Sequence, residues 1–592
     1  MNRRGFIKTT MAISCASFFA PSLMGKTQDK NAILGFKAID INTKDTFVVP
    51  EGYEAKPLIS WGDPLFSKAS AYDESKNINE KAIQNANFVM GDNNDGMFMF
   101  ELENNRALIA VNNEYINPEI MFNHKGKNIS LSDVRYMQNS CGVSIFEVKR
   151  LENGFYELVK DSKYNRRITA QTAMKISGPA KGSDKLQTKT DKKGELVYGT
   201  INNCASGKTP WGTYLTCEEN FNDFFDASAE FSQDVSQKRY KLKKGGGLYG
   251  WSLDERFDLS KNPNEPNRFG WVVEIDPYNP NSTPIKRTAL GRFKHENAEV
   301  VLDKSSHVVV YMGDDEKNEF IYKFVSKNKY DGKSKDLLDE GTLYVAKFNG
   351  KVGDNKGSGE WIELVYGKNG LNAKNGFNSQ ADVVINARLA ASIVGATPMD
   401  RPEWVAADPN SDFVYVTLTN NDTREEVNAP NPRKNNIYGH ILRFVNSDSH
   451  ISTKFIWDIF VLAGNEPFSK TGASKNINKD NIFNSPDGLK FDKYSRLWIQ
   501  TDGKYSNKGE YANMGNNQML CADPLSGEIR RFLSGPIACE ITGVIISDDC
   551  KTMLVGVQHP GEKGANSTFP YGKTPRSTIM QIRKLNGGIL GS

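Results

Sequence analysis

The sequence predicts an all-β protein, specifically a β-propeller of about six blades with long loops and small helical insertions. The first observation behind this prediction is a repeated unit, in which an acidic residue opens a short apolar run that passes an Asp turn into a second, β-rich run. The second is a composition rich in Asn, Asp, Gly and Lys, which suits a loop-rich β protein. Strand pairs that recur along a chain cannot bury their faces alone, and a ring of such pairs solves that problem.

The repeated unit occurs four times between residues 295 and 560. The copies are Glu296 before 298–302 and 308–312, Glu403 before 404–407 and 413–418, Asp487 before 489–491 and 497–500, and Glu540 before 541–546 and 553–557. Equivalent positions in successive blades of a propeller face the same central channel, so we expect these acids to converge. Because crowded carboxylates repel one another unless cations bind between them, the repeat also predicts a site for several metal ions.

The rest of the chain is predicted in less detail. A first strand is expected near residues 47–53, followed by an irregular or helical insertion at 64–86. A turn at 91–96 precedes a strand at 97–102, and the alternating run at 106–112 ends close to Glu114. One short helix fits within 227–245, and the polar segments 328–340 and 421–436 are expected to be loops.

Residues 1–26 are predicted to be a twin-arginine export signal. Arg3 and Arg4 precede Phe6 and Lys8, and a modest apolar stretch follows. This stretch is too short and too polar for a membrane span, so we expect no stable membrane anchor. The prediction implies the twin-arginine export machinery as a partner and the periplasm as the location; the alternative is a cytoplasmic protein with a chance basic start. Residues 27–592 are expected to form a single domain.

Composition and ligand spacing exclude several classes of function. The net charge is +4 with both signs well mixed, so no basic stripe indicates nucleic-acid binding. The cysteines form no C-x-x-C pair, and the six histidines are dispersed without an H-E-x-x-H motif. Carboxylates must therefore supply most of any metal site. An oxidising compartment would permit a disulfide, for which Cys521 with Cys539 or Cys550 is the expected pairing.

The segment 202–220 combines a thiol with two adjacent acids. Cys204 lies in a small-residue loop that leads into a strand ending at Glu218 and Glu219. Neighbours in a strand face opposite sides, so both acids can bind one ion only if the strand has already ended. A soft thiolate beside hard carboxylates suits iron better than calcium alone. The alternative is that Cys204 is simply a small buried residue.

Two further groups are candidates for the same site. Asp314 and Asp315 follow a strand in an acidic loop that would suit calcium, or would simply be solvated. Arg401 and Arg388 could form the fork that binds an oxyanion such as phosphate, or could be structural ion-pair partners. His559 is interpreted as a residue of a capping loop rather than as a ligand.

Seven ordered motifs resemble the PhoX-type alkaline phosphatases. They are residues 209–220, Phe293-Lys294-His295-Glu296, residues 395–403, Asn436 to Ile441, Ser485-Pro486-Asp487, Leu497 to Asp502, and 535–543 with Gln558 to Glu562. The resemblance implies an exported propeller phosphatase with an iron–calcium cluster, expected here to hold two ferric ions and several Ca²⁺. It implies Cys204 and Glu296 as iron ligands, with Glu403 and Asp487 in the cluster.

The same resemblance extends to calcium and to substrate. It implies calcium ligands such as Glu114, Glu219, Asp315 and Glu540, and it implies that Arg401 binds the substrate phosphate. Asn113 departs from the family, where His more often precedes the acid. Glu218 and Asp314 are not among the ligands that the resemblance implies, and they remain candidates because each lies at or just after the end of a predicted strand.

The resulting hypothesis is a monomeric enzyme that releases inorganic phosphate from small phosphomonoesters, and from some diesters. Bound cations would take the part of a nucleophilic side chain. Two rival hypotheses are a calcium-stabilised propeller that serves as a binding or scaffold module, and a lactonase-like hydrolase with a single calcium. Turnover by a Cys204→Ser variant and elemental analysis separate the three.

Overall fold

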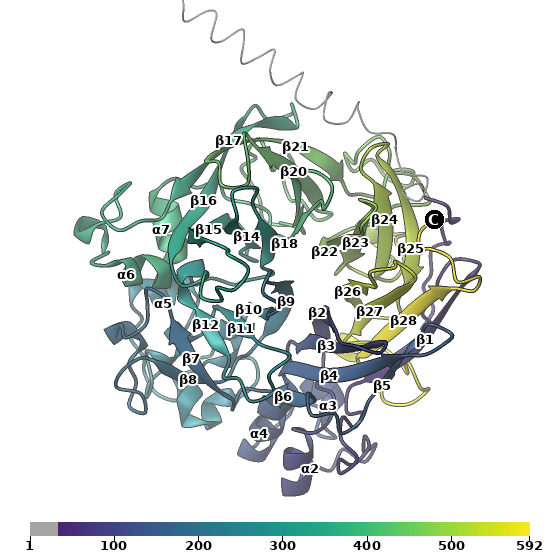
Figure 1. Ribbon diagram of the computed structural model, residues 1–592, viewed down its shortest axis with the longest axis horizontal. Helices are drawn as coiled ribbons and strands as arrows, with labels where there is room; N and C mark the ends of the chain where they lie inside the picture. Colours follow the sequence, from purple (N-terminus) through teal and green to yellow (C-terminus); the bar gives the residue numbers. More distant parts are fainter. Residues whose placement is uncertain (1–33) are drawn as a thin grey trace, which may run out of the picture.

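The computed structural model describes residues 34–592, so the predicted export signal lies outside the described part of the chain. The described chain is mostly β-sheet, which confirms the all-β prediction. Its strands are grouped around a common centre (Figure 1) and form five sheets. Two of the sheets contain β26 (Glu540–Ile546), β27 (Thr552–Gln558), β28 (Thr578–Lys584) and β1 (Tyr53–Ser60), and β22 (Pro486–Phe491), β23 (Leu497–Thr501), β24 (Gln518–Asp523) and β25 (Glu528–Ser534).

Two larger sheets follow one another in sequence. One contains β2 (Asn94–Glu101), β3 (Arg106–Asn113), β4 (Gly142–Arg150), β5 (Tyr156–Leu158) and β6 (Arg166–Ile168). The other contains β9 (Asn203–Lys208), β10 (Tyr214–Glu218), β11 (Val272–Ile275), β12 (Ile285–Arg287), β7 (Ala173–Ser177) and β8 (Leu196–Tyr198). In both sheets, the strand pair that approaches the centre is an antiparallel hairpin with one register shift.

The fifth sheet has nine strands because two antiparallel units join at their outer edges. Its order is β13 (Glu299–Leu302), β14 (His307–Gly313), β15 (Ile321–Lys329), β16 (Gly341–Gly350), β17 (Lys356–Glu363), β21 (Lys454–Leu462), β20 (His440–Asn446), β19 (Phe413–Leu418) and β18 (Pro402–Ala407). Strands β17 and β21 pair antiparallel, from Lys356 opposite Asp458 to Glu360 opposite Lys454. This pairing covers two edges that would otherwise expose unpaired backbone groups.

All four repeated units form hairpins at the predicted places. They are β13–β14, β18–β19, β22–β23 and β26–β27, and each is antiparallel. The predicted run 413–418 coincides with β19, and the predicted run 541–546 begins one residue inside β26. The acid, the apolar run and the Asp turn were therefore sufficient to locate these hairpins.

The first strand begins later than predicted. Pro50 cannot donate to a ladder, and Gly52 adopts φ +82° in a turn closed by Tyr53 N donating to Pro50 O (3.1 Å). Strand β1 therefore starts after the turn, and only Val48 makes an isolated bridge, to Ser534. Strand β1 then pairs with β28 near the end of the chain, which completes the four-stranded sheet.

The innermost strand of each unit contacts the innermost strands on both sides. The cyclic order is β2, β9, β13, β18, β22, β26 and back to β2. The contacts require very close backbone approach at some points: a Cβ on Gly207 would lie 2.0 Å from the carbonyl oxygen of Ala298. The starts of six strands are thereby held around one axis.

Short helices decorate the sheets. The predicted helical segments correspond to α2 (Glu80–Asn85) and α5 (Val235–Arg239), and the others are α3 (Pro118–Met121), α4 (Leu131–Ser140), α6 (Gln380–Ile385) and α7 (Ala387–Ile393). A capping box between Ser130 and Asp133 starts α4. None of the described helices is both long enough and apolar enough to cross a bilayer.

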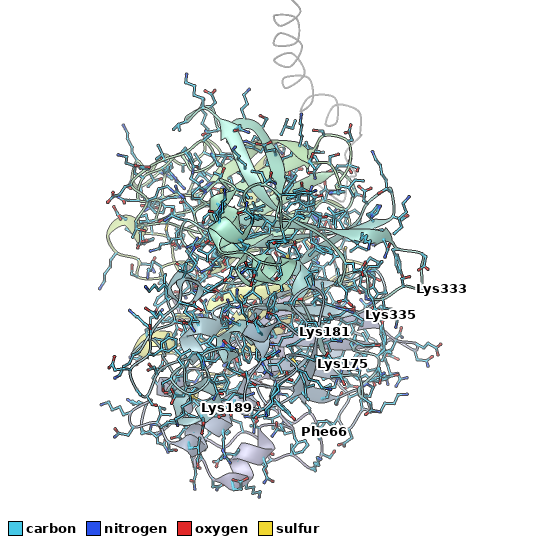
Figure 2. All side chains as sticks on the ribbon, turned by 90° about the vertical axis from the view of Figure 1, so that its left-hand side faces the viewer. Phe66, Lys175, Lys181, Lys189, Lys333 and Lys335 are labelled. Atoms are coloured by element: carbon cyan, nitrogen blue, oxygen red, sulfur yellow. The ribbon has the colours of Figure 1, made fainter. Side chains whose placement is uncertain are left out.

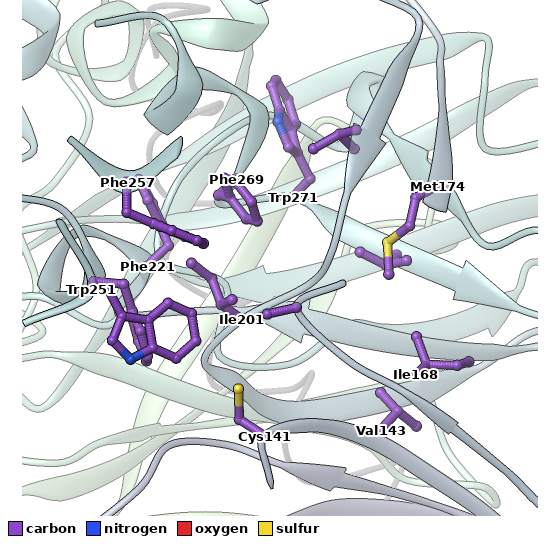
Figure 3. Close-up of a cluster of buried hydrophobic side chains, with 14 of the residues drawn as sticks. Cys141, Val143, Ile168, Met174, Ile201, Phe221, Trp251, Phe257, Phe269 and Trp271 are labelled. Carbon is purple, nitrogen blue, oxygen red and sulfur yellow. The ribbon is translucent and has the colours of Figure 1, made fainter. Parts of the chain in front are cut away.

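The insertion between β10 and β11 has an aromatic core of its own. Trp251, Phe257 and Phe269 are buried there, and Figure 3 shows them beside Phe221 and near Cys141. Polar and charged side chains cover the outside, including the lysines labelled on one flank in Figure 2. The predicted disulfide does not form: all six cysteines within residues 34–592 are free and buried.

Candidate metal centre

Six acidic or thiol side chains lie at the starts of the six innermost strands. They are Asp95 in β2, Cys204 in β9, Glu296 just before β13, Glu403 in β18, Asp487 in β22 and Glu540 in β26. We call these six residues the ring. All of them are at most 8% exposed. The sequence placed four of them in repeated units and Cys204 in a separate motif, and the structure brings all five together.

The local backbone explains why these side chains point inward. The residue two positions before the ring residue adopts a left-handed conformation in five of the six strands: Asn93 (φ 44°), Asn202 (φ 48°), Arg401 (φ 53°), Ser485 (φ 50°) and Ala538 (φ 53°). A register shift follows at the ring residue in β2, β18 and β22. Such bulges turn a side chain away from its ladder direction and are frequent beside active sites.

A second row of side chains lies just past the ends of the adjoining strands. Its members are Glu114 after β3, Glu219 after β10, Asp315 after β14, Asp502 after β23 and His559 after β27. A hairpin places the end of its second strand opposite the start of its first: Glu540 pairs with Gln558, the residue before His559. Five of the six hairpins therefore deliver two polar groups each to the centre, and β18–β19 supplies Glu403 alone.

The two rows form four groups whose ligand atoms lie within 4.8 Å of one another. These are Asp95–Glu114–Cys204, Cys204–Glu219–Glu296, Glu296–Asp315–Glu403 and Asp502–Glu540–His559. Cys204 and Glu296 each belong to two groups. The first three groups therefore form a continuous series linked by a thiol and a carboxyl. Asp487 belongs to none of the four but lies close enough to raise the pKa of Glu296.

The thiol of Cys204 lies against two carboxyl groups. The Sγ atom of Cys204 is 3.2 Å from Asp95 Oδ2 and 3.1 Å from Glu296 Oε1. Within the described chain, one guanidinium forms ion pairs with this cluster: Arg401 Nη2 lies 2.5 Å from Asp315 Oδ2 and 2.9 Å from Glu403 Oε1. Much of the negative charge has no such partner.

The pKa values express this crowding. Burial raises the pKa of Glu296 well above its ordinary value, and the charges of Glu403 and Asp487 raise it further. Burial likewise raises the pKa of Glu219, with Asp315 and Glu114 adding to the effect. Without cations, the cluster would hold protons that its members normally lose below neutral pH.

The pKa values of three other groups respond to the same surroundings. Burial, followed by Asp502, raises the pKa of Glu540 to about 8. Burial lowers the pKa of His559, but the carboxylates of Glu562 and Glu540 outweigh it and raise the pKa to about 10. Burial and the nearby acids Asp95 and Glu296 raise the pKa of the Cys204 thiol well above its ordinary value.

The donor set fits bound cations. Carboxylate oxygens are the ligands that a hard metal ion such as Ca²⁺ prefers. The thiol shared by two of the groups is a soft ligand that suits iron. The Oδ1 atom of Asp315 is buried and accepts no hydrogen bond, so it is free to bind an ion. Gln558 steadies two of the acids, donating Nε2 to Asp95 Oδ2 (3.1 Å) and Glu114 Oε2 (2.9 Å).

Three predicted site residues lie beside the centre rather than in it. Arg388 in α7 is 1% exposed and donates to both carboxylate oxygens of Asp314, at 2.8 and 2.5 Å. Glu218 is fully buried and accepts from Lys286 Nζ at 2.6 Å and from Thr200 Oγ1 at 2.8 Å. Strand β10 ends at Glu218, so Glu219 turns to the opposite side, towards the axis.

Sequence reasoning missed Asp95 and Asp502, and it favoured a loop role for His559. Asp95 was hidden in the Asn- and Asp-rich segment 91–96, which was interpreted as a plain turn. The signal that could have identified it is the shared arrangement: an acid opens a β-rich run, and a second acid, Glu114, follows the next run. Asp502 follows β23 in the same way.

Comparisons with known proteins identify the family of the chain. The family model described as alkaline phosphatase PhoX matches residues 34–561. A solved structure of Pseudomonas fluorescens PhoX in complex with vanadate, a transition state analogue, is 52% identical, with a TM-score of 0.91, and the match covers 94% of this chain and 99% of that one. No curated protein matched.

Two other solved structures are much less similar to the chain. A protein of unknown function from Dyadobacter fermentans is 8% identical with a TM-score of 0.36, covering 90% of this chain and 99% of that one. Trypanosoma rangeli sialidase is 9% identical with a TM-score of 0.32, covering 90% of this chain and 60% of that one. The family match spans most of the chain, and the chain therefore belongs to the PhoX family of alkaline phosphatases, enzymes that hydrolyse phosphate esters with bound metal ions.

Proposed function

We propose that the chain is a monomeric, exported alkaline phosphatase that acts on small phosphomonoesters, and on some diesters, in the periplasm. The observation that carries this proposal is the convergence of ring carboxylates and the Cys204 thiol on one axis. Its export would use the twin-arginine machinery, on the basis of Arg3 and Arg4. The vanadate bound by the Pseudomonas relative is an analogue of phosphoryl transfer, which supports the same chemistry here.

We further propose that the fold is a six-bladed propeller. Six innermost strands contact one another in cyclic order, and each has a ring residue at or near its start. In this interpretation, the nine-stranded sheet is two blades joined by β17 and β21, and the sheet with β1 and β28 is the blade that closes the ring.

The metal ions would be iron and calcium. Cys204 and Glu296 would hold iron, with Glu403 and Asp487 completing its surroundings, because a thiolate is the one soft ligand in the set. Glu114, Glu219, Asp315 and Glu540 would hold calcium, which prefers carboxylate oxygens. When bound, these cations would neutralise charge on the phosphoryl group and activate the attacking oxygen.

Arg401 would bind the substrate phosphate. Its side chain is 26% exposed, whereas those of its partners Asp315 and Glu403 are at most 5% exposed, so the guanidinium lies on the solvent side of the cluster. Once cations occupy the two carboxylates, the planar fork of donors is available for a tetrahedral oxyanion. The left-handed backbone at Arg401 fixes where this fork emerges.

Turnover of p-nitrophenyl phosphate by a Cys204→Ser variant, with elemental analysis of the same samples, tests the proposal. We expect the variant to lose iron and most of its activity together. An unchanged rate with calcium alone would favour the calcium-stabilised binding module or the single-calcium hydrolase instead.

A further inference from the structure

Lys294 lies beside the ring, but within residues 34–592 its side chain forms no ion pair with a ring carboxylate. It occupies the position two before Glu296, and its side chain is 8% exposed. Its Nζ atom donates to Asn220 Oδ1 at 2.6 Å and lies 3.2 Å from Glu316 Oε2. Nothing in the proposed chemistry requires this buried ammonium.

Asn220 connects Lys294 to the carboxylate of Glu219 and orients that carboxylate. Its amide oxygen accepts from Lys294, so its NH₂ group must point the other way, and Nδ2 donates to Glu219 Oε1. Its backbone N–H also donates to Asn202 Oδ1, and Asn202 Nδ2 lies 3.4 Å from Glu114 Oε1. One oxygen of Glu219 is therefore occupied, and the carboxylate is held in a fixed rotation toward Cys204 and Glu296.

The relay continues outward to the insertion that contains α5. Glu316 accepts from Lys241 Nζ at 2.9 Å, and Lys241 follows α5 by two residues. Arg239, the last residue of α5, pairs with Glu319 in the same loop as Glu316. The insertion is thus tied by two ion pairs to the loop between β14 and β15, which also supplies Asp315.

We propose that Lys294 is a positioning residue that acts through Asn220 on Glu219, and that the Lys241–Glu316 pair links this relay to the α5 insertion. The proposal rests on the proposed metal centre, because Glu219 matters here as a ligand. Groups that orient metal ligands typically change metal affinity about 10- to 100-fold when removed.

The test is metal retention by Lys294→Met, which removes the ammonium and keeps the stem. We expect the chelator concentration that removes half of the bound calcium to fall about 10-fold. The matched control is Lys317→Met: Lys317 lies in the same loop region and pairs only with Asp422 at the surface, so its chelator midpoint should not change. Circular dichroism confirms that each variant is folded.

A double variant establishes that Lys294 acts through the amide. Asn220→Ala alone should also lower the midpoint, and Lys294→Met with Asn220→Ala should be no worse than Asn220→Ala alone. Additive losses, or a Lys294→Met midpoint equal to that of the unmodified enzyme, would overturn the proposal. If Lys294→Met does not fold, Asn220→Ala serves as the test, because Asn220 is less buried than Lys294. A chelator midpoint for Asn220→Ala equal to that of the unmodified enzyme would then overturn the proposal.

This failure is distinguishable from failure of the proposed function. If the unmodified enzyme keeps full activity after its metals are removed, the metal-centre proposal is wrong. If it loses metal and activity together while both variants retain metal normally, only the positioning role is wrong.

Discussion

Cys204 is the residue on which the choice of metal depends. It is the only thiol in the ring, and it joins two candidate groups. We expect Cys204→Ser to lower kcat for p-nitrophenyl phosphate by about 100-fold or more, together with loss of iron. The matched control is Cys217→Ala, a buried thiol on the neighbouring strand that belongs to no candidate group; it should retain its iron. Equal iron content in the two variants would contradict the assignment.

Arg401 carries the expected contact to substrate. Asn tolerates its left-handed backbone better than most residues, so Arg401→Asn removes the guanidinium with little added strain. Loss of hydrogen bonds from a charged group costs about 1.5–3 kcal/mol, or roughly a 10- to 100-fold fall in kcat/KM. Arg530→Asn, which loses a pair with Glu528 and the hydrogen bonds to Leu34 O and Phe36 O at an outer strand, serves as the control. Equal kcat/KM values for the two variants would rule out a role for Arg401.

At the scale of single strands, the bulges and left-handed turns position the ring. Gly543 in β26 adopts φ +46°, and a Cβ there would lie 2.1 Å from the backbone oxygen of Asp95. Gly543→Ala therefore combines backbone strain with a clash that displaces a ring residue. Gly367→Ala is the matched control. It introduces backbone strain alone, because φ is +85° and no atom lies within 4 Å of the added Cβ.

We expect Gly543→Ala to lower the free energy of unfolding by at least about 1 kcal/mol more than Gly367→Ala does, the usual cost of overpacking. Denaturant titration measures this difference. Gly543→Ala should also lose metal more readily in a chelator titration. Identical unfolding midpoints would show that β2 and β26 do not need their close contact.

The sequence predicted the strands well, but it did not predict which side chains meet in the folded structure. Four hairpins were located by an acid, an apolar run and an Asp turn, because a period-two pattern with a turn is a local property. Asp95 and Asp502 were missed because an acid in a polar turn looks the same whether it faces solvent or an axis. Arg388 was predicted to be a candidate phosphate ligand, but it pairs with Asp314. This pairing depends on how α7 packs against the loop after β14, which the local sequence does not reveal.

At the scale of the whole molecule, charge repulsion links metal binding to stability. In metal-free protein, Glu540 has a pKa raised from its ordinary 4.5 to about 8. Between these values the folded state holds a proton that the unfolded state has released. The free energy of unfolding must therefore fall as pH rises from about 4.5 to about 8.

Thermal unfolding of chelator-treated protein across this pH range measures the effect. We expect the melting temperature to fall with rising pH, and the slope to flatten when metal ions are restored, because the carboxylates then stay ionised at every pH in the range. A slope unaffected by metal would mean that the carboxylates of the ring do not hold cations.

We propose that the converging acids hold cations that take the part of a nucleophilic side chain. The most direct measurement is p-nitrophenyl phosphate turnover by protein that elemental analysis shows to be free of metal, before and after iron and calcium are returned. We expect no turnover without metal and recovery only when both ions are present. Undiminished turnover by the metal-free protein would contradict it.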